Sequence, residues 1–272
     1  MASPELTDPR SARVRRLRRL ARRAYRAEQR QFLVEGAQAV REALNAHAAG
    51  TAQVDELLVA SEAATRHSDL VDRAAELGVR STLAADEVVA ELSETVTPQG
   101  VVAVVGFVDV DLDVVVGRGP RLVAVLANVR DPGNAGSVIR VADAAGADAV
   151  VFAGDSVDPY NGKAVRASVG SLFHLPIVAA VSVPDALASL RSSGLSLLVA
   201  DGAGEDDLDG LTRLDQPTAW VFGNEAWGVP HEVIQQTDSA VRIPIYGRAE
   251  SLNLATAAAL CLYASARAQR TK

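Results

Sequence analysis

The pattern of hydrophobic and polar positions divides the chain into two stretches, in each of which short apolar runs alternate with amphipathic segments. Apolar runs bounded by turn-forming residues indicate strands, and apolar residues repeated every three to four positions indicate helices. In the first stretch the pattern predicts strands at 31–34, 54–60, 79–83 and 101–107, and helices at 35–46, 62–77 and 85–92. This alternation is typical of a small α/β domain.

The second stretch begins with an almost continuous apolar run at 121–126, of the kind that is buried in a parallel sheet. Further strands are predicted at 149–152, 175–178, 196–200, 218–222 and 241–244, with helices at 135–145, 184–192 and 252–267 and a polar segment at 155–170. We therefore expect an α/β domain with a mostly parallel, wound sheet. In such sheets ligands bind in the loops beyond the carboxyl ends of the strands.

A connecting segment separates the two patterns. Residues 108–120 alternate Asp with Val and end in Gly-Arg-Gly-Pro, which is typical of a linker. A chain of 272 residues is long enough for two separate cores. We therefore predict a first domain at 1–107, a linker at 108–120 and a second domain at 121–272.

Charge changes this picture because it is distributed very unevenly. Residues 10–30 hold ten arginines and a single acid, which gives +9, whereas the whole chain carries −7 and the rest therefore −16 (−7 − 9). A concentrated basic helix on an acidic body indicates contact with a polyanion such as RNA, because phosphate binding depends on local cations. The alternative is a solvated helix face, packed through a thin stripe of Val14, Leu17, Ala21 and Ala24.

The remaining composition excludes several classes of protein. Cys261 is the only cysteine, so an internal disulfide and a multi-cysteine metal site are excluded, and we expect it to be a core residue. The histidines, at 47, 67, 174 and 231, lack ligand spacing, and no metal is predicted. The longest uncharged apolar run, 255–266, is too short for a bilayer and no secretory signal pattern is seen, so we expect a soluble cytoplasmic protein without membrane contact.

The first candidate loop leaves the strand at 121–126 and covers residues 128–140. Asp131-Pro-Gly forms a turn, and Asn134 is expected to cap the following helix. Arg140 would then lie one and a half turns into that helix, within reach of an anion at its N-terminus. An ordinary capped helix with a surface arginine is the alternative.

Two further loops follow strands near the C-terminus. Residues 222–230 read Phe-Gly-Asn-Glu-Ala-Trp-Gly-Val-Pro, and their glycines allow a tight fold that leaves peptide groups available to a ligand. Trp227 either stacks on a base or has a structural role. Residues 243–253 run from a strand into the last helix, where Ser251 or Asn253 can act as the N-cap.

Taken together, the three loops resemble the three motifs of the SpoU (TrmH) family of RNA ribose 2′-O-methyltransferases. The motifs read Asn-x-x-Asp-Pro-x-Asn-x-Gly-x-x-x-Arg, Gly-Asn-Glu-x-x-Gly and Ile-Pro-x-x-x-x-x-Glu-Ser-Leu-Asn, and the resemblance covers about 122–267. The residues of the polar segment that are similar to the family's central segment are Tyr160, Lys163, Arg166, Ser168 and Gly170. The first domain more loosely resembles the family's ribosomal-protein-like RNA-capture domain.

The resemblance implies a SPOUT fold with a deep trefoil knot, a homodimer formed through the catalytic domain, and S-adenosylmethionine as cofactor. The residues that it assigns to the cofactor are Ala200, Asp201, Gly202, Phe222, Gly223, Asn224, Gly228, Ile243, Ile245, Ser251 and Leu252. It adds Lys163 and Arg166 to the RNA-binding residues that the charge of the basic helix predicts, namely Arg15, Arg16, Arg18, Arg19, Arg22 and Arg23.

The resemblance also makes Arg140 the catalytic arginine, surrounded by Asn134, Glu225, Ser251 and Asn253. The family mechanism uses the arginine as a general base. Because a guanidinium gives up its proton with difficulty, positioning of the ribose and electrostatic stabilisation are the alternative roles. We expect ribosomal RNA as substrate, with tRNA second; base methylation by another SPOUT enzyme and a non-catalytic RNA-binding protein are the rivals. A dinucleotide-binding Rossmann enzyme is disfavoured, because no Gly-x-Gly-x-x-Gly follows the first strand of either half.

Overall fold

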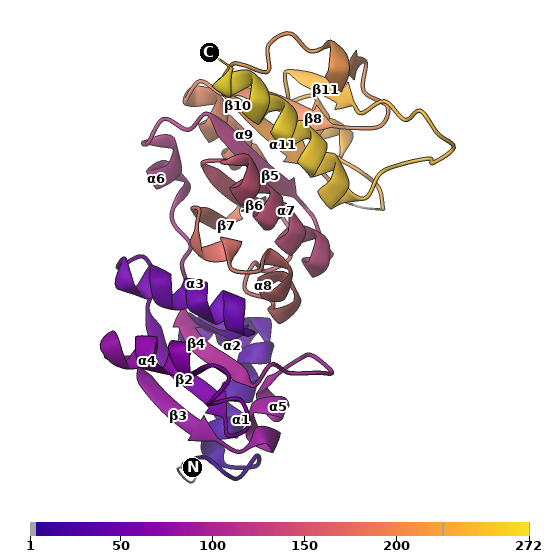
Figure 1. Cartoon of the computed structure of the whole chain (residues 1–272). Helices are drawn as coiled ribbons and strands as arrows, with labels where there is room; N and C mark the ends of the chain where they lie inside the picture. Colours follow the sequence, from indigo (N-terminus) through magenta and orange to yellow (C-terminus); the bar gives the residue numbers. More distant parts are fainter. Residues whose placement is uncertain (1–3, 225, 272) are drawn as a thin grey trace. The chain divides into compact units, whose positions relative to one another are not determined.

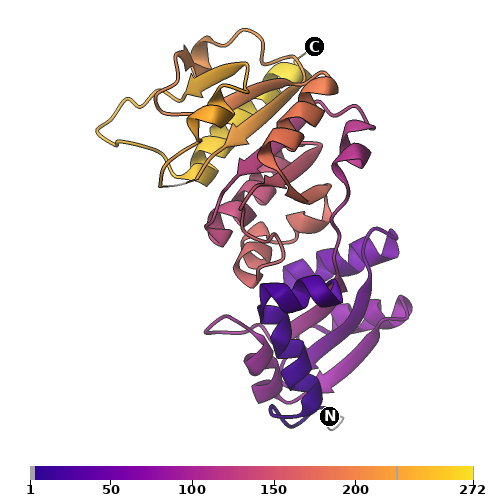
Figure 2. The same cartoon turned by 180° about the vertical axis from the view of Figure 1, so that it is seen from behind.

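The computed structural model describes residues 4–224 and 226–271 and divides into two compact units (Figures 1 and 2). The N-terminal unit contains the chain up to Val108 together with Tyr160–His174, and the C-terminal unit contains Asp109–Pro159 and the chain from Leu175 onward. A short part of the second stretch, including the helix α8 (Gly162–Ser168), thus belongs with the first unit.

The N-terminal unit is built on a four-stranded sheet with the order β1-β4-β2-β3. Its strands are β1 (Gln31–Glu35), β2 (Val54–Ala60), β3 (Arg80–Ala84) and β4 (Val101–Gly106). The strands β1 and β2 are antiparallel to β4, and β3 is parallel to β2. Helices α3 (Ala37–Ala48) and α4 (Ser68–Glu76) pack together, and α5 (Asp86–Leu92) packs with the arginine-rich segment. The predicted small α/β domain is confirmed.

The arginine-rich segment is a broken helix. It consists of α1 (Ala12–Arg18), a 3₁₀ turn η1 (Arg19–Ala21) and α2 (Arg23–Gln29), because Arg22 has an extended backbone with φ −95° and ψ 126°. The apolar stripe of the alternative interpretation is wrong beyond Leu17, since Ala21 and Ala24 are exposed and the buried positions are Leu20 and Tyr25.

The C-terminal unit is built on a seven-stranded sheet with the order β7-β6-β5-β10-β8-β11-β9, in which every neighbouring pair is parallel. Its strands are β5 (Leu122–Ala127), β6 (Ala149–Ala153), β7 (Ile177–Val181), β8 (Ser196–Ala200), β9 (Asp206–Asp207), β10 (Thr218–Phe222) and β11 (Ser239–Arg242). The predicted parallel sheet is confirmed.

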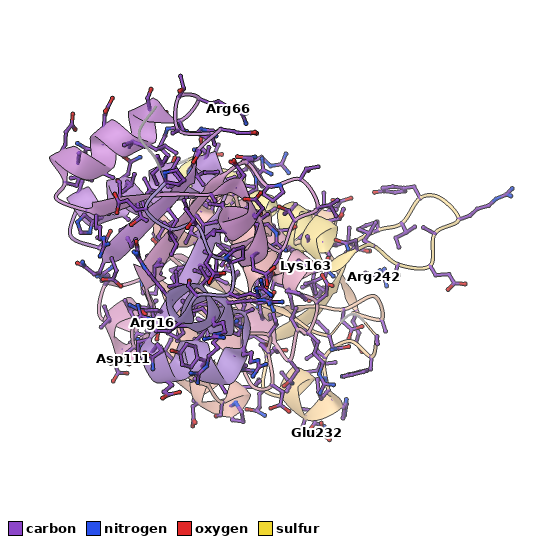
Figure 3. All side chains as sticks on the ribbon, turned by 90° about the horizontal axis from the view of Figure 1, so that it is seen from below. Arg16, Arg66, Asp111, Lys163, Glu232 and Arg242 are labelled. Atoms are coloured by element: carbon purple, nitrogen blue, oxygen red, sulfur yellow. The ribbon has the colours of Figure 1, made fainter. Side chains whose placement is uncertain are left out.

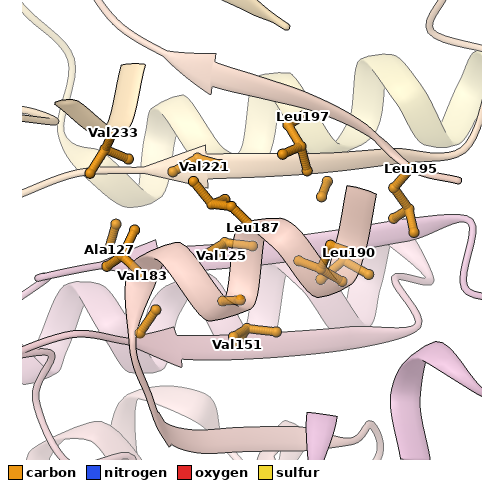
Figure 4. Packing of buried hydrophobic residues seen from close by; sticks show 14 of the residues in the cluster. Val125, Ala127, Val151, Val183, Leu187, Leu190, Leu195, Leu197, Val221 and Val233 are labelled. Atoms are coloured by element: carbon orange, nitrogen blue, oxygen red, sulfur yellow. The ribbon is translucent and has the colours of Figure 1, made fainter. Parts of the chain in front are cut away.

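Helices cover both faces of this sheet (Figures 1 and 2). On one face α9 (Val183–Ser192) packs with α6 (Leu112–Val116), and the short α10 (His231–Ile234) contributes Val233. Figure 4 shows Leu187 of α9 beside Val125 and Val221 of the sheet. On the other face lie α7 (Pro132–Ala145) and α11 (Leu254–Arg270). Burial on both faces explains why β5 is apolar throughout and why β10 is apolar from Ala219 onward.

Several short elements were not predicted. A turn of helix, α6, lies within the expected linker 108–120, and α8 lies within the polar segment. The helix expected at 62–77 begins only at Ser68, because the chain before it makes turns that hydrogen-bond to the end of β2. The helices α6 and α8 have only five and seven residues, so periodicity gives them little signal.

Candidate active site

Four parallel strands of the C-terminal unit end at one edge of the sheet. Leu126 pairs with Phe222, Val221 with Val199, and Ala200 with Val241. The loops that follow β5, β10, β8 and β11 therefore leave the sheet side by side, which brings the three candidate loops to one edge as the sequence predicts.

The loop after β10 closes on itself. The amide of Asn224 donates to the carbonyl of Gly228 at 2.9 Å, and the amide of Gly228 donates to the carbonyl of Asn224 at the same distance. A Cβ on Gly223 would lie only 2.5 Å from the carbonyl carbon and oxygen of Gly228, so only glycine fits there. The buried side chain of Asn224 donates to the carbonyl of Asn128 at 3.0 Å and joins this loop to the loop after β5. Glu225 lies outside the described residues.

The loop after β8 lies against β11. The amide of Asp201 donates to the carbonyl of Val241 at 3.0 Å, and its carboxylate accepts from the amide of Ala203 at 2.8 Å. Gly204 passes so close to Ala240 that a Cβ would lie 2.6 Å from the Ala240 carbonyl oxygen. Ala200, Asp201 and the exposed Gly202 are thus next to the strand that leads into the third loop.

The third loop, residues 243–253, extends from the sheet as a long exposed segment (yellow in Figure 1). Arg242, labelled in Figure 3, anchors the start of this loop. Its guanidinium pairs with the Asp207 carboxylate at 2.7 and 2.8 Å. Tyr246 is 88% exposed, and its hydroxyl donates to Asp209 at 2.9 Å. That hydrogen bond and the negative charge of Asp209 raise the pKa of Tyr246. Sequence reasoning did not find this tether, because acid and phenol are 37 residues apart.

The helices α7 and α11 meet at their N-termini. Asn253 caps α11 by accepting from the amide of Ala255 at 2.9 Å, and its side-chain amide donates to Oδ1 of Asn134 at 2.9 Å. The N-cap of α7 is Asp131 and not Asn134, since the Asp131 carboxylate accepts from the amide of Asn134 at 2.7 Å. Proline directly after aspartate is a known helix-start pattern and could have indicated this cap.

Because α7 begins at Pro132, Arg140 lies farther along it than predicted. Eight residues at 1.5 Å each put it about 12 Å along the axis from the first helical residue. The predicted position of one and a half turns is therefore wrong, and the helix N-terminus does not assist Arg140, since its field decays within the first turn. Arg140 is exposed.

The arginines of the N-terminal unit fall into two groups. Those turned inward serve the fold: Arg13 pairs with Glu56, and the buried Arg26 donates to the carbonyls of Leu20 and Ala21 at 2.8 Å each. The predicted RNA-binding arginines of this segment are all exposed and are Arg15, Arg16, Arg18, Arg19, Arg22 and Arg23 (Figure 3, with Arg16 labelled).

Some of the predicted RNA-binding residues have protein partners. Arg18 pairs with Glu91, and the Arg19 guanidinium lies 3.9 Å from the centre of the Tyr25 ring. Arg166 contacts Glu35 and Glu94, each at 3.2 Å. Lys163 is exposed in the first turn of α8.

Two remaining side chains have simple environments. Cys261 is a buried core residue of α11, as expected, and burial raises the pKa of its thiol to about 12. Trp227 is 59% exposed, and the Arg130 guanidinium lies 5.3 Å from its ring centre.

Within residues 4–224 and 226–271, none of the helices has the length and apolar character needed to cross a membrane.

Two family models match the chain. Residues 121–263 match the SpoU rRNA Methylase family, and residues 11–103 match the MRM3-like substrate binding domain. A curated relative is the Bacillus subtilis 23S rRNA (guanosine(2553)-2′-O)-methyltransferase RlmP, which is 35% identical over 88% of this chain and 89% of its own length.

Solved structures agree over nearly the whole chain. The AdoMet-bound rRNA methyltransferase from Sinorhizobium meliloti has a TM-score of 0.85 and 29% identity, and covers 96% of this chain and 97% of its own. The SpoU methyltransferase AviRb from Streptomyces viridochromogenes, in complex with AdoMet, has a TM-score of 0.82 and 34% identity, and the match covers 95% of this chain and 98% of the AviRb chain. These likenesses confirm the predicted fold class, family and type of enzyme, and the chain belongs to the SpoU rRNA methylase family.

Proposed function

We propose that this chain transfers a methyl group from S-adenosylmethionine to a ribose 2′-hydroxyl in 23S ribosomal RNA. The names of the related enzymes support ribosomal RNA over tRNA as substrate. The observation that carries the proposal is the convergence of the three motif loops at one sheet edge, joined by the Asn224–Asn128 and Asn253–Asn134 hydrogen bonds. This convergence favours an enzyme over a non-catalytic RNA-binding protein.

The residues at this edge fit the cofactor. Gly223 lets the main chain close tightly, and strand-end loops of this kind offer peptide groups to a polar ligand. Ile245 and Leu252 are 39% and 36% exposed, which leaves apolar surface for a flat base. We assign cofactor binding to these residues together with Ala200, Asp201, Gly202, Phe222, Asn224, Gly228, Ile243 and Ser251. When bound, the cofactor supplies an electrophilic methyl group.

We assign alignment of the ribose to Asn134, Ser251 and Asn253, with Glu225 as a further member. Asn134 and Asn253 already bond to each other, so their amides are held in place before substrate arrives. Arg140, two turns along α7, is assigned to the ribose phosphate and to the developing alkoxide charge. This role keeps the guanidinium protonated.

The proposal includes a homodimer that completes each site. On α11 the large side chains of Leu260 and Tyr263 are 45% and 43% exposed, and the Tyr263 hydroxyl reaches the carbonyl of Ala144 on α7. An exposed apolar face that adjoins the helix of Arg140 is a suitable contact for a second copy. Light scattering after size-exclusion chromatography measures whether the protein is a dimer in solution.

We further propose that residues 1–107 capture RNA through the exposed arginines and that residues 121–272, beyond a linker at 108–120, carry out the transfer. Lys163 and Arg166 are included among the RNA contacts. The proposal also holds that the C-terminal segment forms a deep trefoil knot and that the enzyme works in the cytoplasm, where ribosomal RNA is available.

The test is methylation of ribosomal RNA by the wild type and by Arg140→Ala. We expect nuclease-resistant dinucleotides from the wild-type product, since a 2′-O-methyl group blocks cleavage at that ribose. Arg140→Ala should lose transfer by at least a hundredfold and keep its cofactor affinity. Base-methylated product would refute ribose chemistry, and near-wild-type turnover would remove Arg140 from the mechanism.

A further inference from the structure

A cleft lies within the N-terminal unit beside the arginine-rich segment. Its volume is about 250 Å³, and Arg18, Leu20 and Ala21 of that segment line one side. The other lining residues come from β1, from the end of α5 with the chain up to Glu94, and from Tyr160 and the start of α8. Pockets for drug-sized ligands start at roughly 300 Å³, so the cleft suits one small group.

The polar lining of the cleft combines donors with acceptors. Three carboxylates, of Glu35, Glu91 and Glu94, face the guanidiniums of Arg18 and Arg166. Leucines supply apolar walls, namely Leu20, Leu33 and Leu92. The excess of one negative charge disfavours a phosphate, although the neighbouring helix surface is strongly basic.

Two polar groups of the lining, the Glu94 carboxylate and the Ser93 hydroxyl, can form further hydrogen bonds, whereas Glu35 is fully engaged. The Glu35 carboxylate is 9% exposed and is occupied by Thr95, Arg166 and the amide of Glu94. The Glu94 carboxylate is 44% exposed and gives Oε2 to Arg166, so its second oxygen can accept hydrogen bonds. The hydroxyl of Ser93, another lining residue, is buried and has no hydrogen-bond partner within the described part of the chain. A buried hydroxyl without a partner is costly and is satisfied when a polar ligand enters.

Gly162 keeps this arrangement open. A Cβ at that position would lie 2.4 Å from Oε2 of Glu94, so any other residue would displace the carboxylate. Glycine at the start of α8 thus allows Glu94 and Arg166 to stand beside each other at the cleft.

We propose that this cleft binds an unstacked guanine base of the RNA that the arginine-rich segment holds by its phosphates. Guanine carries two adjacent donors, N1–H and the N2 amino group, which match a carboxylate, and two acceptors, O6 and N7, which match a guanidinium. Glu94 accepts from the donor edge, and Arg166 or Arg18 donates to the acceptor edge. Adenine and uracil lack the paired donors, so the carboxylate excludes them. This inference rests on the proposed function in RNA capture.

The test measures binding of fluorescently labelled ten-nucleotide single strands to the full chain by anisotropy, at fixed salt. One strand carries a single guanosine among uridines, and a second carries inosine there, which lacks only the N2 amino group. We expect the wild type to prefer guanosine about tenfold, at the low end of what a bidentate base contact provides, because inosine keeps N1–H and loses one of the two donors. Glu94→Gln should reduce this preference to less than twofold.

A matched control is Glu62→Gln, which removes the same charge from an exposed position of the same unit outside the cleft lining. It should retain the tenfold preference, and thermal unfolding of both variants checks that they fold. Equal binding of the two strands by the wild type, or an unchanged preference in Glu94→Gln, overturns the guanine site. If methylation of ribosomal RNA persists in that case, the proposed function stands; if no RNA is bound at all, both fall.

Discussion

The closure of the loop after β10 can be tested by replacing Gly223 with alanine. The new Cβ would lie 2.5 Å from the carbonyl group of Gly228 and from Cγ2 of Val229, whereas ordinary contacts begin at 3.4 Å. The Gly228 main chain would have to retreat by about 0.9 Å (3.4 − 2.5). No side-chain rotation can relieve a clash with main chain, so the mutual hydrogen bonds between Asn224 and Gly228 must distort.

Overpacking of this kind costs about 1–3 kcal/mol. For a domain of this size each kcal/mol lowers Tm by roughly 2–4 °C, so we expect a fall of about 2–12 °C. Differential scanning calorimetry measures this fall, and titration calorimetry should find S-adenosylmethionine bound at least tenfold more weakly, because the loop also forms the proposed cofactor edge.

The control is Gly210→Ala, since no atom lies within 4 Å of a Cβ at that glycine. It should leave both Tm and cofactor affinity close to those of the wild type. If Gly223→Ala matched the wild type in both measurements, the tight closure would not be what shapes the cofactor edge, and our assignment would be refuted.

Three further predictions follow from burial and charge. Arg26→Met should lower the free energy of unfolding, measured in urea, by about 2–4 kcal/mol, because two carbonyls lose their buried donor. Arg16→Met, at an exposed position, should leave the free energy of unfolding unchanged and should reduce the slope of log K against log salt for RNA binding by about one. Cys261, whose pKa is raised to about 12, should not react with a thiol reagent at pH 8 until the protein is unfolded; rapid reaction in the native state would contradict its burial. A fragment of residues 121–272 should bind a hydrophobic dye more strongly than the full chain, because Tyr160 loses the aromatic rings on which it packs; dye binding equal to that of the full chain would refute this.

The strands were predictable because their signal is local. The strands β2, β8 and β10 match the expected ranges at both ends, since each contains a run of at least four apolar residues and is followed or preceded by polar or turn residues. Burial on both faces of a parallel sheet leaves no other pattern for such residues. The same runs identified the sheet edge and therefore the loops of the site.

The helix starts were less predictable, because a cap depends on which side chain reaches which amide. Asp131 and Asn134 can both cap α7, and only the proline after Asp131 favours the first of them, yet the choice moves Arg140 relative to the helix N-terminus. In the arginine-rich segment, Arg26 reaches back across the break at Arg22 to the carbonyls of Leu20 and Ala21, and nothing in the sequence distinguishes this arginine from its exposed neighbours.

The interval Tyr160–His174 illustrates why chain order and packing can differ. It lies between β6 and β7 in sequence, yet its tyrosine ring stacks 3.9 Å from the ring centre of Phe107, and its hydroxyl accepts from the amide of Val108 at 2.9 Å. Phe173 adds a second ring against Phe32. Two aromatics thirteen residues apart give no periodic signal, but each can bury enough apolar surface to decide where a short polar segment docks. The segment with motif-like residues Lys163 and Arg166 therefore belongs structurally to the unit assigned to RNA capture, which favours RNA rather than cofactor as their ligand.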